Sequence, residues 1–137
     1  MSIIDMKLMR YINLLDRVSR VKTRRCFVYN NVITFAVPKV MMSQAIGPGA
    51  ANVRRIQEQL GKRVKIVAEP SGVENAQEFV EGVVSPLRFK SLELRDGFLV
   101  LTAGSTSKAA LIGRNKRRFE ELRRIIMDNF GVELKIV

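Results

Sequence analysis

An internal repeat is the feature that most constrains how this chain can fold. Each half contains an apolar stretch ending in Ile-Gly, a tight loop, a basic helical stretch, and a glycine followed by a strand ending in Lys-Ile-Val. Gly47 and Gly113 are offset by 66 residues (113 − 47), and Gly61 and Gly131 by 70 (131 − 61). The difference of 4 lies within the basic helix, so the second helix is expected to be about one turn longer. The repeat predicts two copies of one small unit.

Composition places the chain among folded, strongly basic proteins. Its 137 residues fit one domain or two small ones, and 47% hydrophobic with 27% charged residues is ordinary for a soluble protein. The 24 Lys and Arg residues outnumber the 13 Asp and Glu residues and give a net charge of +11. Such an excess favours a polyanion as partner, although ribosomal and membrane-surface proteins are basic as well.

The absence of histidine and the single cysteine exclude several chemistries. Zinc and non-haem iron sites depend on His and Cys, and a Ser-His or Cys-His nucleophile pair needs a histidine. We therefore expect no metal, no cofactor and no catalytic residues. Cys26 lies in an apolar, strand-like run and is expected to be a small core residue. No run is long enough to span a membrane and no signal peptide is seen, so a cytoplasmic protein without a membrane partner is expected.

Local patterns predict the order α-β-β-α-α-β twice, which is an α+β fold. In the first copy we expect helices at 4–18, 40–46 and 50–60 and strands at 26–29, 32–37 and 64–67. In the second copy we expect helices at 74–82, 106–112 and 116–129, strands at 87–95 and 97–103, and a last strand ending at 137. Asn30-Asn31 and Asp96-Gly97 are predicted to form two-residue hairpin turns. Glu69-Pro70-Ser71-Gly72 is the predicted boundary between domains 1–69 and 73–137.

The tight loops at residues 47–50 (the first loop) and 113–116 (the second loop) are candidate phosphate sites. Each precedes a helix, whose first N–H groups are unsatisfied and lie at the positive end of the helix dipole. A glycine lets a phosphodiester approach closely. Basic residues follow in both copies, namely Arg54 and Arg55 in the first and Arg114, Lys116, Arg117 and Arg118 in the second. A plain helical elbow with solvated arginines is the simpler alternative; two matched copies in a basic chain favour nucleic acid.

The Ile-Gly-x-x-Gly loop between two short helices resembles the KH domain, whose loop clamps about four nucleotides of RNA. The element order matches the type II, prokaryotic arrangement. Segments 23–28, 45–56 and 60–64 resemble the paired KH region of the NusA transcription factor family, most closely its short archaeal form of two KH domains. The resemblance covers essentially the whole chain. It implies tandem type II KH domains, each with a three-stranded sheet covered by helices.

The same resemblance implies a single-stranded RNA-binding protein that acts in transcription termination or antitermination. RNA polymerase or other transcription machinery is the further partner that it implies. The residues expected to bind RNA are Gly47, Pro48, Gly49, Ala50, Asn52, Arg54, Arg55, Lys65, Gly113, Arg114, Asn115, Lys116, Arg117 and Arg118.

Both loops depart from the usual KH pattern of Gly, a basic residue, a small residue and Gly. Pro48 stands at the basic position of the first loop and lacks both charge and N–H. The closing glycine is Ala50 in the first loop and Lys116 in the second. The second copy also has Arg118-Phe119-Glu120 where the family has Asn-Val-Arg. Neither loop is therefore complete, and the sequence leaves open whether both bind RNA.

Three other functions compete with this interpretation. A ribosome-associated or ribosome-assembly protein could use the same module on folded RNA. A helix-turn-helix could bind duplex DNA, although the strand pair and the closing Lys-Ile-Val strand fit a KH domain better. An enzyme is disfavoured because no carboxylate pair stands out in a loop and no Walker pattern occurs.

Overall fold

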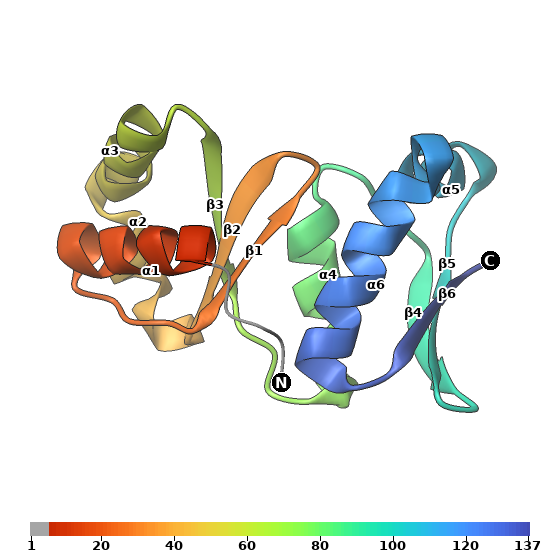
Figure 1. The fold of residues 1–137 in the computed structure, drawn as a ribbon. Coiled ribbons are helices and arrows are strands. Elements are labelled where there is room, and N and C mark those ends of the chain that lie inside the picture. The colour runs from red at the N-terminus through yellow and green to blue at the C-terminus, as the bar shows by residue number, and fades with distance from the viewer. Residues whose placement is uncertain (1–5) are drawn as a thin grey trace. The chain divides into compact units, whose positions relative to one another are not determined.

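The computed structural model describes residues 6–137 and contains two compact units that divide after Glu69 (Figure 1). Each unit is an α+β structure with one three-stranded sheet, and the described part of the chain contains six α-helices. The repeated order α-β-β-α-α-β is confirmed in both units. The predicted helix at 4–18 is present from residue 6, and its first two positions lie outside the described residues.

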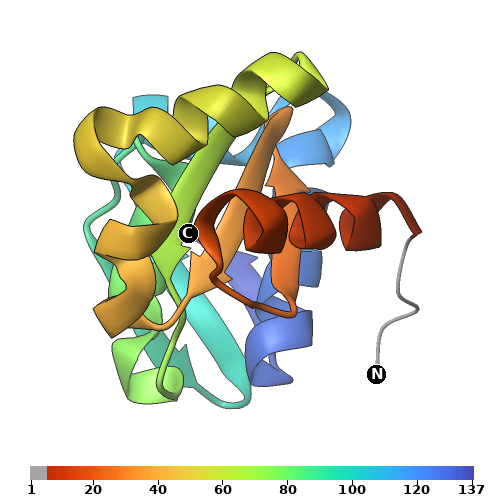
Figure 2. The same cartoon turned by 90° about the vertical axis from the view of Figure 1, so that its left-hand side faces the viewer.

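The first unit packs its helices on one face of its sheet, as Figure 2 shows. Strand β2 lies in the middle, antiparallel to β1 and parallel to β3. Two short 3₁₀ turns flank α2, one at Lys39–Met41 and one at Pro48–Ala50. The elements are α1 (Met6–Ser19), β1 (Arg25–Tyr29), β2 (Val32–Val37), α2 (Met42–Ile46), α3 (Ala51–Leu60) and β3 (Arg63–Ala68).

The core of the first unit is formed by the strand face that meets the helices. Ile33 and Phe35 of β2 are completely buried and pack with Leu15 of α1 and Ile56 of α3. Cys26 belongs to this core, and burial raises the pKa of its thiol to about 12. The prediction that Cys26 is a core residue is confirmed.

The second unit repeats this sheet order with β4-β5-β6. Phe79 of the first helix meets Phe130 edge to face, with ring centroids 5.8 Å apart. Completely buried Leu101, Leu122 and Ile126 belong to this unit's apolar interior. The elements are α4 (Ala76–Val84), β4 (Ser91–Arg95), β5 (Phe98–Thr102), α5 (Ser105–Ile112), α6 (Arg117–Phe130) and β6 (Glu133–Ile136).

One strand prediction in the second unit is wrong at its start. The strand expected from residue 87 begins at Ser91. The amide of Leu87 instead donates to the carbonyl of Val84 at 3.0 Å, which closes a turn after α4. Bonding to β5 starts with Lys90, whose amide donates to Thr102 at 2.7 Å. Leu87, Arg88 and Phe89 therefore precede the strand.

The two hairpin turns and the helices α3 and α6 agree with the predictions made from the repeat. Asn30 and Asn31 have φ of 51° and 64°, the left-handed backbone that a two-residue hairpin turn requires. Asp96 and Gly97 take the same region with φ of 50° and 79°. Helix α3 has 10 residues and α6 has 14, so the predicted extra turn is confirmed. Because one helical turn is about 3.6 residues, the apolar faces stay in phase.

Candidate nucleic-acid interface

Both loops open on a glycine that no other residue can replace without strain. Gly47 has φ 79° and ψ 164°, and Gly113 has φ 74° and ψ 172°. A Cβ on Gly47 would lie 2.8 Å from Cγ of Asn52, and one on Gly113 would lie 2.7 Å from Cγ of Arg118. The positive φ and the close approach of the following helix both demand glycine.

The rest of the two loops follows the same backbone path despite different residues. Gly49 (φ 57°, ψ 29°) matches Asn115 (φ 56°, ψ 29°). Ala50 (φ 61°, ψ 28°) matches Lys116 (φ 58°, ψ 25°). The amide of the last loop residue donates to the opening glycine carbonyl in both cases, at 3.0 Å and 3.2 Å. The repeat therefore extends to the conformation of single loop residues.

The helices that follow the loops begin without a side-chain cap. At the described starts of α3 and α6, no side chain caps the helix by a hydrogen bond. The first amide of each helix, that of Ala51 or Arg117, donates to the carbonyl of Pro48 or Arg114 in the loop. The helix dipole adds positive potential at this end of each helix. Such a helix start suits an anionic oxygen, with phosphate as the commonest example.

Asn52 and Arg54 brace the first loop. The side-chain amide of Asn52 donates through Nδ2 to the carbonyl of Gln44 in α2, at 3.0 Å. Nη1 of Arg54 donates to the carbonyl of Gly49 within the loop. Both side chains therefore contact backbone of the site itself. Their place in the sequence gave no sign of this role, because it depends on where the loop carbonyls point.

The second loop is more cationic and is braced differently. Arg114, Lys116 and Arg117 are exposed, whereas Arg118 is largely covered and pairs with Glu121 at 2.8 Å. The second loop thus offers three exposed cations around one helix start. The first loop itself has none, and Arg54 and the exposed Arg55 follow on α3.

Lys65 is the predicted site residue that the structure separates from the loops. It pairs in register with Thr34, and its neighbours Val64 and Ile66 point to the helix-covered core. Because successive side chains of a strand point to alternate faces, the Lys65 side chain projects from the opposite face of the sheet. Burial and the neighbouring charge of Arg63 lower its pKa.

Gln44 is a residue of the site that sequence reasoning missed. Its side-chain Nε2 donates to the carbonyl of Ser19 at the end of α1, at 3.0 Å. Its backbone carbonyl accepts the hydrogen bond from Nδ2 of Asn52. Gln57 makes a similar link, its Oε1 accepting from the amide of Val64 in β3 at 3.0 Å. Neither glutamine breaks the local helical pattern, so no sequence signal marked them.

Residues 6–137 contain neither a cluster of metal ligands nor a membrane-spanning helix. The His, Cys, Asp and Glu side chains of this range form no group of three placed to hold a metal ion. None of the helices within the range has the length and apolar character needed to cross a membrane.

Fold and site define a small α+β protein whose two units each present a glycine-opened loop at a helix start. No protein family model matches the chain. It is 26% identical over 128 residues to a protein named "Probable transcription termination protein NusA" from Halococcus morrhuae, covering 91% of this chain and 90% of that protein. The solved crystal structure of APE1850 aligns with a TM-score of 0.66 and 27% identity, over 98% of this chain and 100% of that one. These similarities support a relationship to the NusA and KH-domain proteins.

Proposed function

We propose that this protein binds single-stranded RNA through its two loops and acts as a NusA-like factor in transcription termination or antitermination. The observation that carries the proposal is the shared loop backbone, which twice places a glycine without a side chain beside the N-terminus of a helix that no N-cap side chain covers. The similarity to a protein named as a NusA and the net charge of +11 support the same function.

In this proposal the two units are KH domains of type II, in the two-domain form found in archaea. Their order of elements and the three-stranded sheets with one parallel and one antiparallel pair support this. The protein would work in the cytoplasm, without catalysis, metal or cofactor. RNA polymerase or other transcription machinery is its proposed protein partner.

The two loops contribute differently to the proposed binding. In the first loop, backbone N–H groups and the glycines meet the phosphate, and Asn52 and Arg54 hold the loop in place. In the second loop, the exposed side chains of Arg114 and Lys116 add charge to the same backbone arrangement. RNA bases would lie beside the loops along the helices and the edge of the sheet, as KH domains bind single strands.

Fluorescence anisotropy with short single-stranded RNAs tests the proposal. Duplex RNA and duplex DNA serve as competitors, and binding is followed across a salt series. Each phosphate contact with a single strand should contribute about 0.7 to the slope of log affinity against log salt. We expect single strands to bind best, and we expect this binding to persist at near-physiological salt. A stronger duplex competitor would contradict the proposal and favour a helix-turn-helix.

A further inference from the structure

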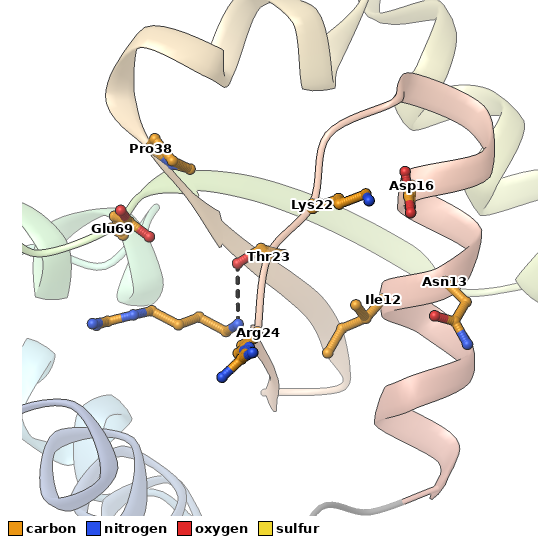
Figure 3. Close-up of a pocket in the computed structure, with 9 residues that line it drawn as sticks. Ile12, Asn13, Asp16, Lys22, Thr23, Arg24, Pro38 and Glu69 are labelled. Atoms are coloured by element: carbon orange, nitrogen blue, oxygen red, sulfur yellow. Dashed lines mark hydrogen bonds between the residues drawn. The ribbon is translucent and has the colours of Figure 1, made fainter.

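A pocket lies in the first unit, away from its loop. It sits at the end of the sheet where β1 begins and where β2 and β3 end (Figure 3). Its volume of about 570 Å³ falls within the ordinary size range of small-ligand sites. The lining residues are Ile12, Asn13, Asp16, Lys22, Thr23, Arg24, Arg25, Pro38 and Glu69, and none of them belongs to the first loop or to α3.

The segment that crosses this pocket, between α1 and β1, is held in place by side-chain hydrogen bonds. Ser19 accepts from the amide of Val21 at 3.1 Å. Thr23 donates to the carbonyl of Ala36 in β2 at 2.5 Å. It also accepts from the amide of Arg25 at 3.0 Å, and Figure 3 draws this bond as a dashed line. Because the backbone is already fixed, a ligand that binds here does not have to order it.

Charges of both signs line the pocket on different elements. Lys22 and Arg24 come from the fixed segment and are exposed. Asp16 comes from α1, and Glu69 follows β3, where its amide extends the sheet by donating to Val37 at 2.8 Å. The carboxylates lie on opposite sides of the segment that carries the cations (Figure 3). With Arg25 of β1, three cationic side chains and two carboxylates line the pocket, so it suits a ligand with both an anionic group and hydrogen-bond donors.

We propose that this pocket binds one nucleotide of a single-stranded RNA and reads its base. Lys22 and Arg24 hold the backbone phosphate, and the carboxylates of Asp16 and Glu69 accept hydrogen bonds from N–H groups of the base. Ile12 and Pro38 supply apolar surface for the base. The proposal rests on the proposed RNA binding, because its ligand is part of the same strand that the loops hold.

The acidic residues give the pocket a definite base preference. Carboxylates accept hydrogen bonds from exocyclic amino groups, as Asp and Glu do with cytosine. Adenine, guanine and cytosine carry such an amino group, whereas uracil does not. The pocket should therefore favour an amino-bearing base over uracil.

The first experiment measures this preference by anisotropy. The probes are a short oligouridine and the same oligomer with a single internal adenosine or cytidine, and the proteins are the wild type and Asp16→Asn/Glu69→Gln. The wild type should bind the substituted oligomers about 5-fold more tightly or better, since a well-placed polar contact to a base is worth about 1–3 kcal/mol. In the double variant the preference should disappear, while oligouridine binding holds or tightens because two negative charges are gone.

The second experiment tests the phosphate contact with a control taken from the repeat. Lys22 and Arg24 lie three residues and one residue before β1, and Arg88 and Lys90 lie at the same distances before β4. Lys22→Gln/Arg24→Gln should weaken binding at least about 10-fold and reduce the salt slope by about 1.4, which corresponds to two phosphate contacts. Arg88→Gln/Lys90→Gln removes the same charge from exposed positions and should have a smaller effect.

The outcomes separate this proposal from the proposed function. If the wild type fails to bind single-stranded RNA, the function itself fails. If it binds and the loop variants weaken it, but the base preference survives in Asp16→Asn/Glu69→Gln, the pocket proposal alone is wrong. Equal losses in the Lys22/Arg24 and Arg88/Lys90 variants would also overturn it, because they would indicate general attraction. Circular dichroism melting of each variant shows whether the fold is retained.

Discussion

The two loops share a backbone and differ in nearly every side chain. Only the opening residue is the same, and it is glycine in both because the next helix passes too close for a Cβ. The closing position is Ala50 in one loop and Lys116 in the other, yet the dihedral angles agree within a few degrees. The comparison teaches that the opening glycine and the close packing of the helix fix the path, whereas the closing residue can vary.

This conservation of shape has an energetic cost. A residue with a Cβ in the left-handed region costs about 1–2 kcal/mol, although asparagine is tolerated better. The first loop contains one such residue, Ala50, and the second contains two, Asn115 and Lys116. A strained conformation kept in both copies is typical of a functional site. The braces differ as well, since Asn52 and Arg54 bond to backbone whereas Arg118 pairs with Glu121.

The largest expected effect comes from breaking the shared opening position. Gly47→Ala places a Cβ at a positive φ and within 2.8 Å of Asn52, so we expect a loss of stability of about 2 kcal/mol or more and a displaced loop. Gly49→Ala is the matched control, because it also has a positive φ but no atom within 4 Å of its Cβ. Its cost should be about 1 kcal/mol. Urea unfolding of both variants measures the difference, and equal midpoints would contradict the steric argument.

Charge reversal in the second loop should have the next largest effect. Arg114→Asp/Lys116→Asp replaces two exposed cations with carboxylates, and we expect RNA affinity to fall at least about 10-fold at moderate salt. The fold should persist because both side chains point into solvent. Anisotropy titration gives the affinity, and Arg88→Asp/Lys90→Asp is the control for charge alone. Unchanged affinity would assign binding to the first loop.

Removing a brace of the first loop should have a moderate effect. Asn52→Ala loses the hydrogen bond to the Gln44 carbonyl, which should lower stability by about 1 kcal/mol. If Asn52 positions the loop and does not touch phosphate, affinity falls while the slope of log affinity against log salt stays constant. A slope reduced by about 0.7 would contradict this, because it would mean that the displaced loop has lost a contact between a cation and a phosphate.

The smallest expected effect is a gain, produced by making the first loop resemble the second. Pro48→Lys restores an N–H and a positive charge at the position that Arg114 occupies in the second loop. We expect affinity to rise a few-fold at low salt and the salt slope to increase by about 0.7. The same titration at high salt should show little gain. No gain at low salt would indicate that the first loop does not meet phosphate.

Much of the fold could be predicted because the repeat and the turn residues carry it. The two hairpins follow from Asn30-Asn31 and Asp96-Gly97, whose side chains tolerate a positive φ. The extra turn of α6 follows from the spacing of glycines. The start of β4 could not be found, because the alternating Leu87-Arg88-Phe89 before the strand does not show where backbone pairing begins.

The site was predictable in its backbone and less so in its side chains. Glycine spacing located both loops, since glycine is required where the helix passes closely. The roles of Asn52 and Arg54 depend on the directions of carbonyl groups, which no sequence pattern encodes. The position of Lys65 could have been predicted, because the alternation of Val64, Lys65 and Ile66 along the strand places the lysine on the face opposite the core.

The most direct test of the central claim is an amide NMR titration with a short single-stranded RNA. The account predicts that the amides at the start of α3 and at the start of α6 shift first and most, together with those of Gly49 and Asn115, because the proposed contacts are backbone N–H groups. Shifts at both helix starts would establish that both loops bind the RNA. Shifts confined to other surfaces, with both helix starts unperturbed at saturation, would contradict the account.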